Sequence, residues 1–92
     1  MMINLYGHFS DEVGMVLVAD LGDYDLYRSE SPDGGFYDIK VIYHDNVNIK
    51  DKDALVSEAD WNSIEEVLKE IEEDSDVDTD SSVNFIEELL NI

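Results

Sequence analysis

Acidic side chains dominate the last third of the chain and recur at helical spacing. On a helix, residues four apart such as Glu66 and Glu70 are separated by about 6 Å along the axis. A row of carboxylates at that spacing suits contact with Lys and Arg side chains that normally hold phosphates. The chemistry predicted is therefore electrostatic capture of a basic surface. The carboxylates expected to make this contact are Glu65, Glu66, Glu70, Glu73, Asp74, Asp76, Asp78 and Asp80.

The net charge of the chain exceeds what solubility requires. Its 92 residues include 24 Asp and Glu against 5 Lys and Arg, which gives a formal net charge of −19. Small soluble domains need a net charge of magnitude about 2–8, and self-repulsion destabilises a compact domain. The excess indicates a function or a high-salt environment, and a plain solvated surface is the alternative. Direct binding to nucleic acid or to an anionic membrane is excluded, because both need a basic face.

The density of this charge matches that of a nucleic acid. A compact chain of this length is expected to be about 32 Å across, and a DNA duplex of that length carries about 19 negative charges. The chain also has no Cys and mixes predicted strands with predicted helices. In these respects it resembles the small acidic DNA-mimic proteins of phages and mobile elements. Those proteins block restriction enzymes, CRISPR effectors, uracil-DNA glycosylase or nucleoid proteins. The resemblance implies an inhibitor of anti-restriction or anti-CRISPR type, and it implies no particular site residues.

A second acidic pattern, residues 76–87, resembles an EF-hand calcium loop. The acids fall at the first, third, fifth and twelfth loop positions. The sixth position, where the family has Gly for a sharp turn, holds Ser81. The alternative is an acidic linker in which Asp78 and Asp80 favour the dipole of a following helix and Ser81 or Ser82 caps it. If the loop binds Ca²⁺, its oxygen ligands are Asp76, Asp78, Asp80, Ser82 and Glu87.

No catalytic pattern stands out, so we predict that the protein is not an enzyme. His8 and His44 fall in or beside predicted strands, without a Cys nucleophile. Gly34-Gly35 has no following helix to complete an anion site. With 24 acids, close carboxylate pairs are inevitable and carry no specificity. The tyrosines are expected in the core and on the sheet, with an exposed subset available as interface anchors: Tyr6, Tyr24, Tyr27, Tyr37 and Tyr43.

The first part of the chain, residues 1–57, is expected to form strands. Alternating apolar and polar residues predict strands at 3–9, 24–28 and 36–43. The continuous apolar run 15–19 predicts a strand covered on both faces. Short connections between these segments predict an antiparallel meander. Within the polar stretch 45–53, Val47 and Ile49 indicate a short edge strand guarded by lysines.

The acidic part of the chain, residues 58–92, is expected to form helices. Trp61, Ile64 and Leu68 recur at helical spacing, and Ser57 or Asp60 can cap the helix start. A second, shorter helix is predicted from about Ser82. The expected fold is α+β, a meander of four to five strands followed by two C-terminal helices in two layers. The chain is expected to form one domain, residues 1–92, with a sheet part at 1–57 and a helical acidic part at 58–92.

The predicted partner is a basic nucleic-acid-binding protein or nuclease. A dedicated inhibitor of one basic protein, of immunity or antitoxin type, is the other interpretation of an acidic face. No signal peptide or membrane span is recognisable, which favours the cytoplasm. A homodimer would lengthen the charged track. If the helical acids are not the contact, the next candidates are Asp20, Asp23, Asp25 and Asp38.

Overall fold

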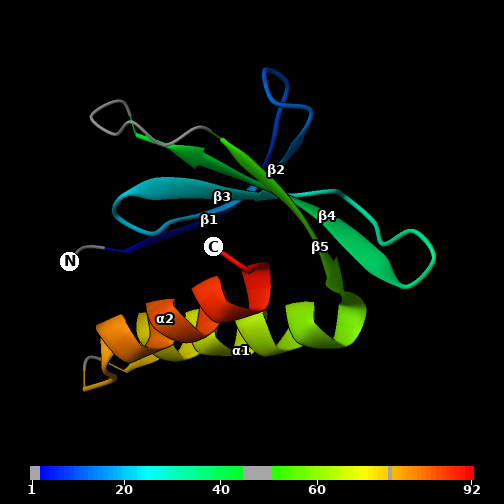
Figure 1. Ribbon diagram of the computed structural model, residues 1–92. Coiled ribbons are helices and arrows are strands. Elements are labelled where there is room, and N and C mark those ends of the chain that lie inside the picture. The colour runs from blue at the N-terminus through cyan, green and yellow to red at the C-terminus, as the bar shows by residue number, and fades with distance from the viewer. Residues whose placement is uncertain (1–2, 45–50, 75) are drawn as a thin grey trace.

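The chain folds as a meander of five strands followed by two helices. In a computed structural model that describes residues 3–44, 51–74 and 76–92, the strands are β1 (Asn4–Ser10), β2 (Met15–Asp20), β3 (Tyr24–Arg28), β4 (Phe36–Tyr43) and β5 (Lys52–Ser57). Each strand pairs antiparallel with the next, in the order β1-β2-β3-β4-β5. The helices are α1 (Glu58–Glu73) and α2 (Thr79–Leu90). This confirms the predicted α+β fold (Figure 1).

The two helices cover one face of the sheet. They run side by side in opposite directions beneath the strands (Figure 1). The core lies between the two layers. Every second residue of a strand faces the helices, and helix residues three or four apart face the sheet. Apolar residues occupy these positions. No buried polar or charged residue occurs among the described residues. The least exposed core members are Ala19, Leu21, Leu26, Ile39, Val41, Trp61, Ile64, Ile86 and Leu90.

Within the described part of the chain, no helix covers the opposite face of the sheet. The prediction that residues 15–19 are covered on both faces is therefore wrong: Ala19 is buried, whereas Met15 to Val18 are only half-buried. The pairing register shifts between Leu5 and His8 and again between Leu17 and Ala19. Such irregularities bend a strand, and the β1–β2 hairpin rises away from the helices (Figure 1).

The last strand begins at Lys52 and pairs along its length with β4. Along it, Ala54 is half-buried and Val56 is buried, while Leu55 points to the uncovered face and is 63% exposed. The predicted edge strand at Val47 and Ile49 lies outside the described residues.

Each helix begins at a side chain that caps its free backbone N–H groups. Ser57 Oγ accepts a hydrogen bond from Asp60 N at 3.1 Å, which confirms the Ser57 alternative for α1. For α2 the cap is Asp78, which accepts from Ser81 N at 3.3 Å. The helix therefore begins at Thr79, three residues before the predicted start, because the acid ahead of the two serines takes the capping position.

Candidate functional site: the acidic helical layer

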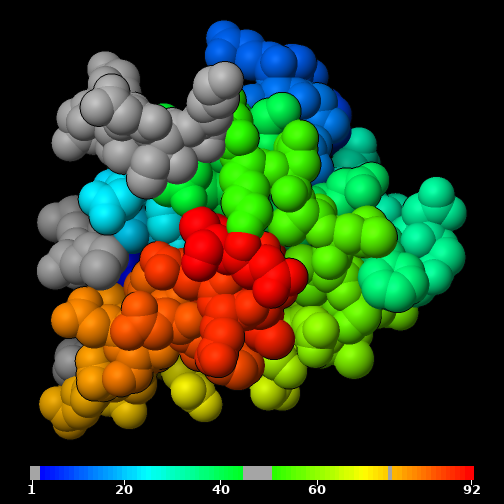
Figure 2. All heavy atoms as spheres, in the orientation of Figure 1, coloured from blue at the N-terminus to red at the C-terminus, as the bar shows by residue number. Residues whose placement is uncertain are grey.

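Carboxylates project from the two helices and from the segment between them. Residues 58–92 carry thirteen acids and one Lys, for a net charge of −12, whereas residues 1–57 carry a net charge of −7. We call the carboxylates of residues 58–92 the acidic helical layer. In Figure 2 these residues, coloured yellow-green to red, form the lower part of the visible face. Seven of the eight predicted contact residues are exposed: Glu66, Glu70, Glu73, Asp74, Asp76, Asp78 and Asp80.

Glu65, the eighth, differs from the others because it is half-buried and tied to the core. Its Oε1 accepts a hydrogen bond from Trp61 Nε1 at 2.9 Å. It also lines a groove between α1 and the first two strands, beside Leu5 and Val18. Glu65 lies one turn after Trp61, which is 1% exposed, so its carboxylate lies at the edge of the indole, beside the N–H group. Glu65 therefore supports the fold rather than the outward surface.

The charge of the layer is not neutralised within the described part of the chain. There the ion pairs within 4.0 Å are Lys40 with Asp53 and His44 with Asp20 and Asp25. All of these join residues of the sheet part. Apart from Glu65 and Glu87, which are half-buried, the carboxylates of the layer are exposed. Among the described residues they have no cationic partner within 4.0 Å, so the layer presents its charge outward.

The last turn of α1 carries acids at the carboxyl end of the helix, where negative charge is unfavourable. Glu70, Glu72 and Glu73 lie at its carboxyl end, and no basic residue occurs in that turn. The carboxyl end carries the negative pole of the helix dipole, so each acid there destabilises the helix by about 0.3–1 kcal/mol. Glu66 and Glu70 are also like charges four residues apart, which adds repulsion. Fold stability does not explain this placement.

The structure does not form the predicted calcium loop at residues 76–87. Because α2 begins at Thr79, Asp80, Ser82 and Glu87 are helical residues. Asp80 and Glu87, seven residues apart, are separated by about 10 Å along the axis, whereas Ca²⁺ needs its oxygens within about 2.6 Å of the ion. Asp78 is committed to the cap, and hydrogen bonds from the Ser81 side chain and backbone hold the pKa of its carboxyl below the usual range. The segment is an acidic connection that leads into a helix, as in the linker interpretation, but the cap is Asp78 and not Ser81 or Ser82.

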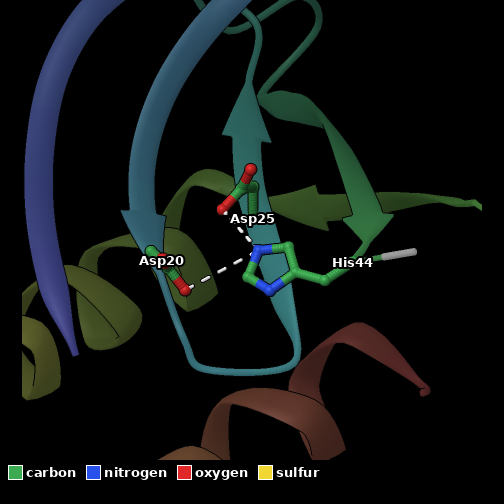
Figure 3. A group of neighbouring side chains, drawn as sticks. All are labelled: Asp20, Asp25 and His44. Carbon is green, nitrogen blue, oxygen red and sulfur yellow. Dashed lines mark hydrogen bonds and ion pairs between the residues drawn. The ribbon is translucent and has the colours of Figure 1, made fainter. Parts of the chain in front are cut away.

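A group that the sequence did not reveal lies at the end of the sheet. His44 Nε2 lies 3.0 Å from Asp25 Oδ1 and 3.8 Å from Asp20 Oδ1 (Figure 3). The hydrogen bond to Asp25 is the main reason why the pKa of His44 is raised above its usual value, and the nearby charges of Asp25 and Asp20 add to it. The register that places Asp20 opposite Asp25 could have suggested the group. The other predicted candidates on the sheet, Asp23 and Asp38, are exposed.

The remaining candidates are distributed between core and surface. His8 is exposed on β1, where its ring packs edge-on to that of Tyr6, with ring centroids 5.9 Å apart. Tyr24 is buried, and Tyr43 packs against it with ring centroids 5.4 Å apart. Tyr6 is 46% exposed.

No family model, no curated protein and no solved structure matches this chain. Charge and geometry are therefore the features that bear on its function. Among the described residues, no helix combines the length and apolar character needed to cross a membrane.

Proposed function

We propose that the protein is a non-enzymatic decoy that binds the basic nucleic-acid site of another protein, such as a nuclease. The observation that supports this most is the acidic helical layer, whose carboxylates have no cationic partner among the described residues. A basic groove that holds phosphates presents Lys and Arg side chains to an incoming anion. Carboxylates on a rigid two-helix surface offer such side chains an alternative set of acceptors.

The magnitude of the charge supports nucleic-acid mimicry. The longest dimension of the molecule is 35 Å, and a DNA duplex of that length carries about 21 phosphate charges. The chain carries a net charge of −19. A groove that attracts duplex DNA by its potential is therefore expected to attract this protein with comparable strength.

The shape of the layer supports it as well. The sixteen residues of α1 extend about 24 Å, which is the rise of about seven base pairs. Glu66 and Glu70 are both exposed and lie about 6 Å apart along that axis, close to two base-pair steps. Because α2 runs beside α1 (Figure 1), its exposed acids Asp80 and Glu88 add to the charge of the same layer.

The placement of acids at the carboxyl end of α1 favours a function over mere solubility. Acids on loops would provide solubility without opposing a helix dipole. Residues kept at a cost to stability are typical of sites that contact a partner. Reversing these charges is therefore expected to stabilise the fold and weaken the contact, two effects that a purely structural role would not combine.

A pull-down with tag-bearing protein from nuclease-treated lysate tests the proposal. The expected result is capture of a protein that itself binds nucleic acid, identified by mass spectrometry. Duplex DNA should displace it, and so should raising the salt from about 0.05 M to 0.3 M, because the contact is electrostatic. Capture of a single partner that ignores both DNA and salt would instead favour a dedicated inhibitor. Capture of no nucleic-acid-binding protein would contradict the decoy proposal.

Charge-reversal variants locate the contact. Glu70→Lys with Glu73→Lys should weaken capture about tenfold or more, which corresponds to about 1.4 kcal/mol. The same pair should raise the melting temperature, because cations at a helix carboxyl end are favourable. The matched control is Glu12→Lys with Glu30→Lys, an equal change of charge at exposed positions of the sheet part. Equal weakening by both pairs would show that only net charge matters and would contradict a role for the helical layer.

A further inference from the structure

The ends of three neighbouring strands bring two carboxylates and an imidazole together. Asp20 ends β2, Asp25 lies in β3 and His44 directly follows β4. One ligand atom from each residue lies within 4.8 Å of the other two. Figure 3 shows the imidazole ring with Nε2 turned toward both carboxylates. Since Leu26 and Val41 face the helices, strand alternation puts Asp25 on the uncovered face.

We propose that Asp20, Asp25 and His44 form a binding site for a divalent first-row transition metal ion such as Zn²⁺ or Co²⁺. Carboxylate oxygens and imidazole nitrogens bind Zn²⁺ at about 2.0–2.2 Å. Two such ligands on one ion therefore lie roughly 3 Å apart. The separations from Nε2 are 3.0 Å to Asp25 Oδ1 and 3.8 Å to Asp20 Oδ1. A small rotation of the Asp20 side chain would bring its Oδ1 closer to Nε2. One ion could then contact Asp20 Oδ1, Asp25 Oδ1 and His44 Nε2 at bonding distance.

The surroundings hold these side chains in place. Asp20 Oδ1 accepts a hydrogen bond from Gly22 N at 2.9 Å. His44 N donates to the Asp23 carbonyl at 3.0 Å, which anchors the residue beside the β2–β3 turn. The hydrogen bond between His44 Nε2 and Asp25 Oδ1 at 3.0 Å orients the ring toward the carboxylates (Figure 3).

Charge and exposure fit a hydrated cation. Two carboxylates face one imidazole, and among the described residues no Lys or Arg lies within 4.0 Å of either carboxylate. A divalent ion would neutralise this local excess of negative charge. The side chains of Asp20, Asp25 and His44 are 27%, 31% and 36% exposed, so water can fill the remaining coordination positions. The imidazole favours a transition metal, whereas Ca²⁺ and Mg²⁺ prefer oxygen alone.

The site would act on the sheet and not on the acidic helical layer. A bound ion would join the ends of β2, β3 and β4 and would stabilise the fold by mass action. The chain's other histidine, His8, is exposed on β1 and provides an internal control. The proposal is independent of the decoy function, since the two tests use different residues and different ligands.

Titration of tag-free protein with CoCl₂, ZnCl₂ and CaCl₂ at about 0.15 M salt tests the site. The expected result is one Co²⁺ or Zn²⁺ per chain, visible by calorimetry and by Co²⁺ absorption, with Ca²⁺ at least about tenfold weaker. In NMR spectra of the unaltered protein, Zn²⁺ should shift the imidazole signals of His44 and not those of His8. This measurement needs no variant, so it remains decisive even if a variant fails to fold.

Three variants complete the test. His44→Gln and Asp25→Asn should each weaken Co²⁺ binding by about tenfold or more, and His8→Gln should leave it unchanged. Circular dichroism without metal checks that each variant is folded. Equal binding by all variants, equal affinity for Ca²⁺, or shifts at both histidines would assign the ion to the diffuse acidic surface and overturn the site. No detectable Co²⁺ or Zn²⁺ binding would also overturn it and leave His44 as an ion-pair partner of the two carboxylates.

Discussion

Glu65 and Glu66 are adjacent acids with opposite roles, and replacing each with Ala should separate them. Glu65 accepts the Trp61 indole hydrogen bond at 2.9 Å, whereas Glu66 is exposed and has no hydrogen bond or ion pair among the described residues. Both replacements remove one negative charge from the same turn of α1. Both also exchange Glu for Ala, with the same gain in helix propensity. The difference between the two variants therefore isolates the contact with Trp61.

The expected difference follows from the burial of the indole. Trp61 is 1% exposed, so loss of the acceptor leaves its N–H in a nearly dry environment. An unsatisfied buried donor costs about 1–3 kcal/mol. Glu65 is half-exposed, and water entering the vacated space would recover part of this. We expect Glu65→Ala to lower the free energy of unfolding by about 1–2 kcal/mol relative to Glu66→Ala. In a domain of this size that corresponds to a melting temperature about 5–12 °C lower.

Urea unfolding followed by the fluorescence of the single Trp measures this difference directly. Native-state emission should move to longer wavelength in Glu65→Ala and stay unchanged in Glu66→Ala. Glu65→Gln, which keeps a neutral acceptor, should lie between the two. If the two Ala variants unfold within about 0.3 kcal/mol of each other, no more than the usual additivity error, the hydrogen bond does not support the fold and Glu65 returns to the outward contact surface.

Three further perturbations test other contacts. Ser57→Ala, which removes the cap of α1, should destabilise the fold by about 1 kcal/mol in urea titrations. Arg28 lies over two aromatic rings, 5.5 Å from the Trp61 centroid, and Arg28→Lys should cost about 1 kcal/mol in the same assay, since Lys stacks less well. Burial and the nearby Glu87 raise the pKa of Tyr24 above its usual value. The unfolded chain therefore loses this proton first, stability should fall as pH rises above about 10, and Tyr24→Phe should reduce that fall.

The parts of the fold that were predicted correctly depend on local signals. Apolar alternation located β1, β3 and β4, and a continuous apolar run located β2, each within one residue of the observed bounds. In α1 the spacing of Trp61, Ile64 and Leu68 matches the buried face. Ser57 caps that helix for a reason visible in the sequence, because its hydroxyl reaches the free N–H three residues ahead. Each of these features involves residues within about one turn or one strand of each other.

The parts that were missed depend on competition or on long-range register. Asp78, Ser81 and Ser82 are all good caps, and periodicity does not decide among them, so the start of α2 was placed three residues late. The prediction that Glu65 belongs to the outward contact surface missed its hydrogen bond to Trp61. That bond depends on how deeply the indole is buried, which the sequence does not show. The Asp20–Asp25–His44 group requires knowing which residues of three strands are neighbours, and the shift between Leu17 and Ala19 shows that simple alternation does not give that register.

The carboxylates of this protein divide into two groups with different physical roles. Some have a partner in the fold: Glu65 binds Trp61, Asp78 caps α2, and Asp25 binds His44. The exposed acids at the end of α1 have none among the described residues, and they oppose both the helix dipole and one another. Stability alone would replace this second group with Lys, and solubility would be met by fewer charges placed elsewhere. A requirement for negative potential at that surface would account for their position, and the proposed binding to a basic partner would create such a requirement.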